Sequence, residues 1–400
     1  MIRRVLAAKA LRSFADGFIA VVLPAYLLAL GLGQLDVGLI GTATLSGSAL
    51  ATLAVGRWGH RCSIRRLLLA ASLAMAATGM AFAGLSSLWP LLIVAFMGTL
   101  NPSSGDASVF LPLDHTMLAS APERQRTVVF ARYSFVGSMC AAGGALAAGA
   151  PEWAAGRGAL SMLDALRAMF ISYAAIGFVV WLLYLRLPDP HTAEQKSASP
   201  LGPSRGIVWR LAALFSVDSF AGGLILNSLL ALWLFQRFGM SLAAAGAFFF
   251  WTGLLAATSQ LLAPLLARRI GLINTMVFTH IPSSLCLIGA ALAPTLPLAL
   301  GLLLVRSALS QMDVPARSAF VMSVVTPAER PAAASFTAVP RSLASALGPT
   351  LAGAFFAVGA MATPLVACGV LKIAYDLALF AAFRRVEAER NRAVERLRQN

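Results

Sequence analysis

The chain alternates long apolar runs with short polar connections almost from end to end. Each run is close to the length of about 20 residues that a helix needs to cross a bilayer. Twelve such runs lie near residues 8–30, 37–58, 66–88, 90–112, 128–150, 165–186, 208–234, 242–266, 272–293, 296–320, 333–357 and 362–384. The pattern predicts an all-α integral membrane protein with twelve transmembrane helices.

One long polar segment interrupts this pattern in the middle of the chain. Residues 187–207 are rich in proline, serine and charge, which is typical of a linker. The linker separates a predicted N-terminal six-helix bundle, residues 1–186, from a C-terminal one, residues 208–384. Residues 385–400 form a charged, amphipathic cytoplasmic tail, which we expect to be a helix at the membrane surface or in water.

The two halves carry related sequences. The segment DASVFLPLDHTMLASAPER, which begins at Asp106, corresponds to DVPARSAFVMSVVTPAER, which begins at Asp313, and their final arginines lie 206 residues apart. Likewise RSFADGF, with Asp16, corresponds to LFSVDSF, with Asp218. A spacing near half the chain length indicates two copies of one unit. Because each copy holds six spans, the copies point the same way across the membrane, as two pseudo-symmetric bundles.

Composition agrees with a membrane protein and disfavours other classes. Hydrophobic residues make up 59% of the chain and charged residues 12%, and the mean hydropathy is +0.80; soluble domains carry about 25% charged residues. The net charge of +15 resides in short loops between apolar runs, so we expect no nucleic-acid binding. The four cysteines lie far apart and indicate neither a disulfide framework nor a metal site.

Basic residues set the expected orientation. The loops that follow even-numbered spans lie on the same side of the membrane as both termini. These loops hold most of the basic loop residues, among them Arg61, Arg65, Arg268 and Arg269. By the positive-inside rule, both termini are predicted to be cytoplasmic, in the inner (cytoplasmic) membrane of the cell. The N-terminal apolar run resembles a signal peptide, but charged residues interrupt it and no small-residue cleavage site follows, so it is predicted to be an uncleaved first span.

The loop after the second run reads GRWGHRCSIRR, residues 56–66. It is similar to the signature loop of the major facilitator superfamily, where a glycine precedes an aspartate-arginine pair, a second glycine and further basic residues. The first glycine and the basic cluster match, whereas His60 replaces the acid and Ser63 the second glycine. The resemblance covers essentially the whole chain, and it implies the twelve-helix superfamily fold and transport by alternating access.

In that family the loop acid helps to latch a cytoplasmic gate. Because His60 replaces it, we expect the basic residues Arg61 and Arg65 to use another partner, for which Asp114 at the end of the fourth span is the candidate. Arg132 and Arg341 occupy matching positions near the cytoplasmic ends of the fifth and eleventh spans. They either contribute to the gate or extend to the membrane surface.

The resemblance also bears on direction. Family exporters carry a Gly-Pro pair with nearby glycines in the fifth span, where this chain has GGALAAG without a proline, at residues 143–149. The fuller version, GPTLAG at residues 348–353, lies in the eleventh span. The motif is compatible with antiport.

Ionisable residues within spans mark functional sites in membrane proteins. Asp16 lies one helical turn after Arg12, and is either a proton carrier tuned by that arginine or half of a structural ion pair. Asp218 has Leu214 at the matching position, so we expect it to be unpaired and suited to proton exchange. Asp106 in the fourth span is the third candidate for proton coupling.

The tenth span carries a polar stripe. Arg306, Ser310, Asp313 and Arg317 follow helical spacing and therefore share one face. We expect Arg306 to hold an anionic group of the substrate, or the carboxylate of Asp16 or Asp218, and Ser310 to contact substrate. Asp313 and Arg317 lie nearer the cytoplasm and are candidate gate residues.

Four other polar or aromatic side chains are candidates for the substrate cavity: Tyr26, Asn227, Trp251 and Gln260. In the twelfth span, Lys372 and Asp376 lie four residues apart and are predicted to pair with each other in a structural role.

These observations predict a secondary transporter, acting as a monomer, that moves a small molecule with protons, most readily as an exporter. Uptake of a small organic anion, and a lipid flippase or facilitator, stay open as alternatives. We expect no enzyme, cofactor or metal site, because the four histidines are scattered and no phosphate-binding glycine loop is present.

Overall fold

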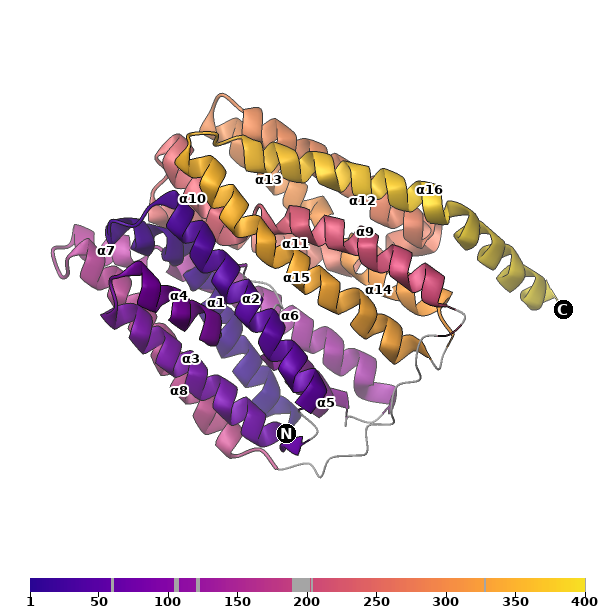
Figure 1. Cartoon of the computed structure of the whole chain (residues 1–400), viewed down its shortest axis with the longest axis horizontal. Coiled ribbons are helices and arrows are strands. Elements are labelled where there is room, and N and C mark those ends of the chain that lie inside the picture. Colours follow the sequence, from indigo (N-terminus) through magenta and orange to yellow (C-terminus); the bar gives the residue numbers. More distant parts are fainter. Residues whose placement is uncertain are drawn as a thin grey trace. The chain divides into compact units, whose positions relative to one another are not determined.

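A computed structural model describes the chain except residues 59–60, 104–107, 120–122, 189–201, 203, 327–328 and 400. It gives no side-chain surroundings for residues 119, 123–127, 330–332, 335 and 385–399. Within the described part, every regular element is a helix (Figure 1). The helices are α1 (Ile2–Ala29), α2 (Gln34–Trp58), α3 (Ile64–Gly84), α4 (Leu88–Met97), α5 (Phe110–Ala119), α6 (Glu123–Ala147), α7 (Ala150–Gly156), α8 (Met162–Leu185), α9 (Arg205–Gly223), α10 (Asn227–Phe238), α11 (Leu242–Ile270), α12 (Leu272–Leu292), α13 (Leu296–Ser310), α14 (Asp313–Val324), α15 (Arg330–Ala357) and α16 (Thr363–Gln399).

The all-α fold class predicted from hydropathy is confirmed, and every predicted apolar run falls on a helix or a pair of helices. Among the described residues, nine helices are long and apolar enough to cross a membrane by length and composition. The runs outside these nine are the broken fourth run and the runs in α6 and α15, which are rich in alanine, glycine and serine. The last run continues without a break through the predicted tail, because α16 extends to Gln399.

Three of the predicted runs are each split into two helices. Proline explains two of the splits. Its ring clashes with the carbonyl group four residues earlier, and it has no N–H to donate to that carbonyl, so a helix does not continue through it. Pro102 follows Gly98, where α4 ends, and Pro315 follows Gln311, where α13 ends. The third split separates α9 from α10 directly after Gly223. The sequence NPSSGD at residues 101–106 predicts a break in the fourth run, whereas the other two breaks were not predicted.

The chain divides into two compact units. Unit 1 comprises Met1–Lys196, Gly223–Leu254 and Ser345–Pro364, and unit 2 comprises Ser197–Gly222, Leu255–Ala344 and Leu365–Asn400. Unit 1 therefore combines residues of the first half of the chain with all of α10 and parts of α11 and α15 from the second half.

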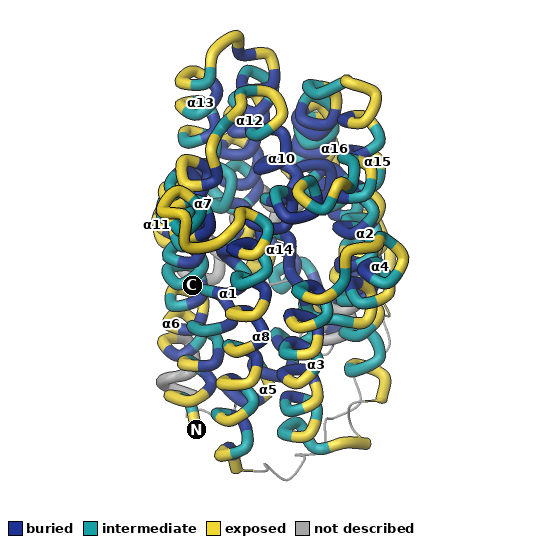
Figure 2. The backbone as a smooth tube through the Cα atoms, turned by 90° about the vertical axis from the view of Figure 1, so that its left-hand side faces the viewer, coloured by how far each residue is buried: buried dark blue, intermediate teal, exposed yellow. Residues whose placement is uncertain are grey.

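Small residues bring the helices of unit 1 together. A Cβ at Gly17 of α1 would meet the Ala141 carbonyl oxygen of α6 at 2.0 Å, and one at Gly144 of α6 would meet the Phe14 oxygen of α1 at 1.9 Å. α3 and α8 run side by side in the same unit (Figure 1). Burial varies along this unit: α10 is largely buried, whereas the short helix α7 and the loop after it are mostly exposed (Figure 2).

The Gly-Pro motif of the eleventh run packs against the second. A Cβ at Gly38 of α2 would meet the Pro349 oxygen of α15 at 2.3 Å, so only glycine fits there. Next to this contact the Thr350 hydroxyl lies 2.8 Å from the Thr42 hydroxyl. Small residues thus join two helices from opposite halves of the chain within unit 1.

Unit 2 has its own apolar core, to which α9, α12, α14 and α16 contribute. Phe215, Met276, Phe320 and Leu379 are all buried in it. α12 also packs along α13 and α14. This core surrounds the charged side chains described next.

Candidate functional site

Unit 2 contains a group of charged and titratable side chains from four helices. We call it the unit 2 cluster; its members are Asp218 of α9, His280 of α12, Asp313 and Arg317 of α14, and Lys372 and Asp376 of α16. Five of the six residues are less than a tenth exposed, and the Lys372 side chain is 13% exposed. Charges that are this deeply buried must be paired to be tolerated.

Asp218 is held between two cations. The Lys372 Nζ lies 2.6 Å from Asp218 Oδ1, and an Arg317 guanidinium nitrogen lies 3.0 Å from Asp218 Oδ2. Arg317 also donates to Asp313, one turn earlier on α14. The expectation that Asp218 is unpaired is therefore wrong. Its partners come from α14 and α16 rather than from its own helix, where Leu214 occupies the position matching Arg12.

His280 connects the two ends of the cluster. Its Nδ1 lies 3.0 and 3.1 Å from the two oxygens of Asp376. Its Nε2 lies 3.4 Å from Lys372 Nζ and 3.9 Å from Asp218 Oδ1. When Nε2 accepts from Lys372, Nδ1 carries the proton and donates to Asp376. The prediction that Lys372 pairs with Asp376 is wrong, because Lys372 pairs with Asp218 and Asp376 with His280.

The charges of the cluster can change by one proton. Its three carboxylates and two permanent cations leave a single negative charge when the imidazole is neutral, and a proton on His280 cancels that charge. Arg341 of α15 is not a member of the cluster, but its positive charge interacts electrostatically with Asp218 and Asp313. A proton on His280 would therefore change the balance of charges within the cluster.

Unit 1 contains a smaller buried group, which we call the unit 1 cluster: Arg12 of α1, Asp114 of α5, Tyr133 of α6 and Tyr184 of α8. Arg12 and the Tyr133 hydroxyl (2.9 Å) both donate to Asp114 Oδ2, while the Tyr184 hydroxyl donates to Oδ1 at 3.1 Å. The guanidinium carbon also lies 4.0 Å from the centre of the Phe110 ring. One guanidinium and two phenol hydroxyls thus share the two oxygens of one carboxylate.

This arrangement differs from the predicted gate. Asp114 is completely buried and uses both oxygens within unit 1, so it is not available to the basic loop. Arg65 donates instead to the Leu185 carbonyl oxygen at 2.5 Å, and Arg61 is exposed. Arg12 forms an ion pair with Asp114, and Asp16 is half-buried on α1.

The remaining predicted site residues are scattered. The Tyr26 hydroxyl donates to the Phe82 carbonyl and its residue is fully buried, so it holds helices together and lines no cavity. Gln260 Nε2 lies 3.4 Å from Gln311 Oε1, near the break between α13 and α14. The other residues are Trp251, which is 54% exposed, Asn227, Ser310, Arg306 and Arg341, which are half-buried, and Arg132, which is exposed. Asp106 lies outside the described residues.

Sequence reasoning undervalued half of the unit 2 cluster. It selected Asp218, Asp313 and Arg317, but considered Lys372 and Asp376 structural and treated His280 as one of four scattered histidines. A usable signal was present, because an ionisable side chain inside an apolar run is costly wherever it occurs. His280 lies in the ninth run, and Lys372 and Asp376 lie in the twelfth.

A carboxylate outside the spans fixes the start of α9. Glu329, between α14 and α15, accepts hydrogen bonds from the hydroxyls of Ser204 (2.6 Å) and Thr326 (2.7 Å) and from the backbone N–H of Gly202. These bonds favour the ionised form, so they lower the pKa of Glu329 from 4.5 to about 2. The end of the linker is thereby tied to the loop before α15, a contact that the sequence did not reveal.

Comparisons with known proteins agree with this fold. The chain aligns along 96% of its length, at 24% identity, with 94% of the uncharacterized membrane protein YJR124C of Saccharomyces cerevisiae (strain ATCC 204508 / S288c). Its fold is similar to the crystal structure of the nucleoside transporter NupG (TM-score 0.73, 16% identity, 96% of this chain and 98% of that one).

Two further solved structures share the fold. One is a bacterial homolog of the human lysosomal transporter Spinster, in an inward-facing and unoccupied conformation (TM-score 0.73, 16% identity, 96% of each chain). The other is the human organic anion transporter MFSD10 (TM-score 0.60, 18% identity, 94% of this chain and 99% of that one). At these identities the likeness shows the fold alone. The family model of the Major Facilitator Superfamily matches residues 5–312. The chain therefore belongs to the Major Facilitator Superfamily, and it is a multi-pass membrane transporter.

Proposed function

We propose that this transporter couples the movement of a small molecule to the movement of protons, as an exporter, and that the unit 2 cluster is the coupling site. One observation carries the proposal: Asp218 is held by Lys372 and Arg317 beside a histidine that bridges to a second carboxylate. Buried carboxylate–histidine groups in membrane proteins serve as proton relays. The cluster offers both a proton acceptor and ion pairs that the proton can rearrange.

The coupling step follows from the distances. A proton on His280 turns the imidazole into a cation, 3.4 Å from Lys372 Nζ and 3.9 Å from Asp218 Oδ1. The imidazolium repels Lys372 and competes with it for Asp218, so the link between α9 and α16 weakens. Loss of the proton restores the first pairing. A change in protonation thereby becomes a change in how tightly α9, α14 and α16 are held together.

Alternating access requires a contact that opens. We assign this role to the contact in unit 1 between Gly38 and Thr42 of α2 and Pro349 and Thr350 of α15. It joins helices of the two sequence halves through small side chains and one hydroxyl pair, and can part at low energetic cost. With both termini on the cytoplasmic side of the inner membrane, as we propose, this contact lies toward the opposite face.

Uptake of a small organic anion is the second candidate. Arg306 has no ion pair among the described side chains, although its helix lies in the apolar span and its neighbour Ser307 is buried. An unpaired guanidinium in such a place favours an anionic ligand. Likeness in fold to the organic anion transporter MFSD10 is consistent with this chemistry. A flippase or facilitator, in contrast, would be insensitive to substitution of Asp218.

The test uses purified protein in liposomes that contain a pH-sensitive dye, with a panel of organic cations, anions and nucleosides. A transported compound should trigger proton movement in the parent protein, and Asp218→Asn should abolish it. Asp164→Asn is the matched control, because that carboxylate is 56% exposed and lies in unit 1. Protons moving against the compound indicate export, and protons moving with it indicate uptake. Transport of a compound without proton movement, unchanged in Asp218→Asn, would refute the proposal.

A further inference from the structure

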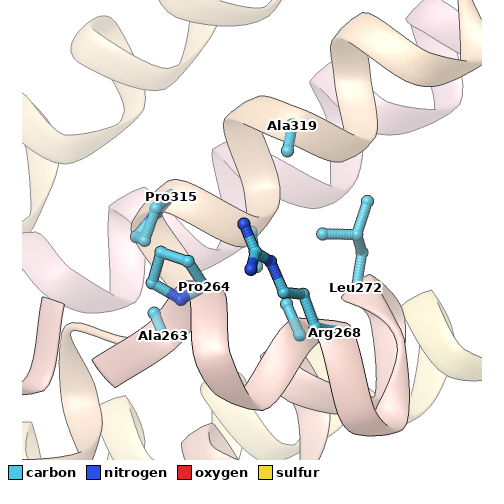
Figure 3. Close-up of a pocket in the computed structure, with 8 residues that line it drawn as sticks. Ala263, Pro264, Arg268, Leu272, Pro315 and Ala319 are labelled. Carbon is cyan, nitrogen blue, oxygen red and sulfur yellow. The ribbon is translucent and has the colours of Figure 1, made fainter. Parts of the chain in front are cut away.

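A cavity of about 260 Å³ lies in unit 2 between the C-terminal part of α11 and α14. Its walls are Ala263, Pro264, Ala267, Leu272, Pro315, Ala316 and Ala319, with Arg268 as its one charged residue. Alanine and proline are too short to fill the space between the two helices. Figure 3 shows the Arg268 side chain rising from α11 toward Pro315 and Ala319.

The residues around this cavity suit an amphiphilic ligand, which has an apolar chain and a charged head group. Its lining is apolar apart from the guanidinium, and among the described side chains Arg268 makes no ion pair. An apolar chain gains by leaving water and entering such a space. A single guanidinium at the cavity adds strong, bidentate recognition of a phosphate or carboxylate.

The surroundings identify a lipid as the source of that amphiphile. On the same stretch of α11, Leu261, Leu262 and Leu265 are 60%, 51% and 59% exposed, which is expected of a face turned toward acyl chains. Arg268 and Arg269 end this helix on the predicted cytoplasmic side, where anionic lipids attract basic residues. We propose that the cavity binds an anionic phospholipid, with an acyl chain between α11 and α14 and the phosphate on Arg268.

The position of the cavity gives such a lipid a role. Its wall residues Pro315, Ala316 and Ala319 belong to α14, the same helix that carries Asp313 and Arg317 of the unit 2 cluster. α14 is separated from α13 by the break at Gln311 and Met312. A lipid packed against α14 therefore steadies the helix that presents Arg317 to Asp218. This regulatory step depends on the proposed coupling site, whereas lipid binding itself does not.

Lipid binding is tested by native mass spectrometry of the detergent-purified full chain, titrated with phosphatidylglycerol or with phosphatidylcholine of the same acyl chains. We expect phosphatidylglycerol to bind more tightly, and Arg268→Gln to weaken it about fivefold. Arg269→Gln is the matched control, since it removes the same charge one residue away from the cavity lining. Ala319→Phe fills the cavity and should reduce binding of both lipids. Hydrogen exchange of α14 should slow with phosphatidylglycerol in the parent but not in Ala319→Phe.

Three results would overturn the proposal. Equal losses in Arg268→Gln and Arg269→Gln would mean that the lipid responds only to surface charge. Unchanged binding in Ala319→Phe would mean that no chain enters the cavity. Tighter binding of a soluble fatty acid than of phosphatidylglycerol would assign the cavity to a cytosolic ligand. None of these readouts involves transport, so they stay separate from the test of the coupling site.

Discussion

The two buried clusters contain similar side chains but differ in how many partners compete for each carboxylate. In unit 1, the two oxygens of Asp114 receive Arg12, Tyr133 and Tyr184. In unit 2, Arg317 is shared between two aspartates, and Lys372 contacts both Asp218 and His280. A carboxylate with one complete set of donors has a single stable arrangement. A cluster with shared partners can regroup its ion pairs, and this is the property that the proposed coupling site needs.

Matching positions of the two sequence repeats show where the two clusters differ. Asp16 and Asp218 occupy matching positions, and Asp218 is a member of the unit 2 cluster. In unit 1 the cation comes from the first span itself, as Arg12, whereas in unit 2 Leu214 replaces it and the cations come from α14 and α16. The replacement of Arg12 by Leu214 between repeats is therefore associated with two different sets of buried ion pairs.

The largest effect is expected at Asp114. Asp114→Asn leaves Arg12 buried without its carboxylate, and loss of one partner of a buried pair costs about 3–5 kcal/mol of the free energy of unfolding. The measurement is the fraction of folded, monodisperse protein that survives heating in detergent. Asp164→Asn, whose pair with Arg167 is exposed, should cost about 1 kcal/mol or less. An Asp114→Asn protein as heat-resistant as the parent would show that the unit 1 cluster does not hold the fold.

Substitution of Lys372 tests whether transport depends on the ion pairs of the unit 2 cluster. Lys372→Met removes the closest cation of Asp218 while Arg317 remains, so the protein should fold but transport about tenfold more slowly. Lys9→Met is the matched control, because Lys9 lies 5.0 Å over the Tyr133 ring in unit 1. The measurement is the initial rate of proton-driven transport in liposomes. Equal slowing in both variants would remove the distinction between the two clusters.

His280 should govern the pH dependence of transport. His280→Gln keeps a hydrogen-bond donor for Asp376 but cannot gain a proton, so the transport rate should depend less on pH than in the parent protein. Asp376, Lys372, Asp218 and Tyr375 surround this imidazole and remain in place. His115→Gln, next to Tyr133 in unit 1, is the control and should keep the parental pH profile. A parental profile in His280→Gln would place the titrating group elsewhere.

The smallest effect is expected at Glu329. Its pKa is lowered to about 2 from 4.5, so its contribution to stability is fully present above the unfolded value and is lost as the pH falls through the folded one. Amide hydrogen exchange at the start of α9 should therefore be unaffected by this group between about pH 5 and 8. Glu329→Gln should speed that exchange at every pH in this range, because donors from Ser204 and Thr326 lose an ionised acceptor. A ratio of the exchange rates of variant and parent that changes between about pH 5 and 8 would contradict the lowered pKa of Glu329.

The fold was largely predictable because its signal is local. Apolar runs of the right length gave the helices, and the Asn101–Asp106 segment indicated a break in the fourth run. The pairings within the clusters could not be predicted in the same way. Asp218 and Lys372 are 154 residues apart, and His280 and Asp376 are 96 apart. Whether they meet depends on the rotation of each helix, which packing sets and which hydropathy does not record.

Spacing along one helix misled the prediction where partners were available on others. Lys372 and Asp376 are one turn apart, yet each bonds to a different helix, because desolvated charges gain more from close tertiary partners than from a neighbour on the same surface. Arg317 and Asp313 have the same spacing and do pair. Helical spacing alone therefore does not determine which ion pair forms in a buried cluster.

The most direct test of coupling compares two transport modes in Asp218→Asn liposomes. Exchange of labelled for unlabelled substrate at equal pH needs no net proton movement, whereas accumulation driven by a pH gradient does. The account predicts that Asp218→Asn retains exchange and loses gradient-driven accumulation, because the variant can still alternate but no longer responds to a proton. Gradient-driven accumulation at the parental rate in Asp218→Asn would contradict the account, and the unit 2 cluster would then be structural, like its counterpart in unit 1.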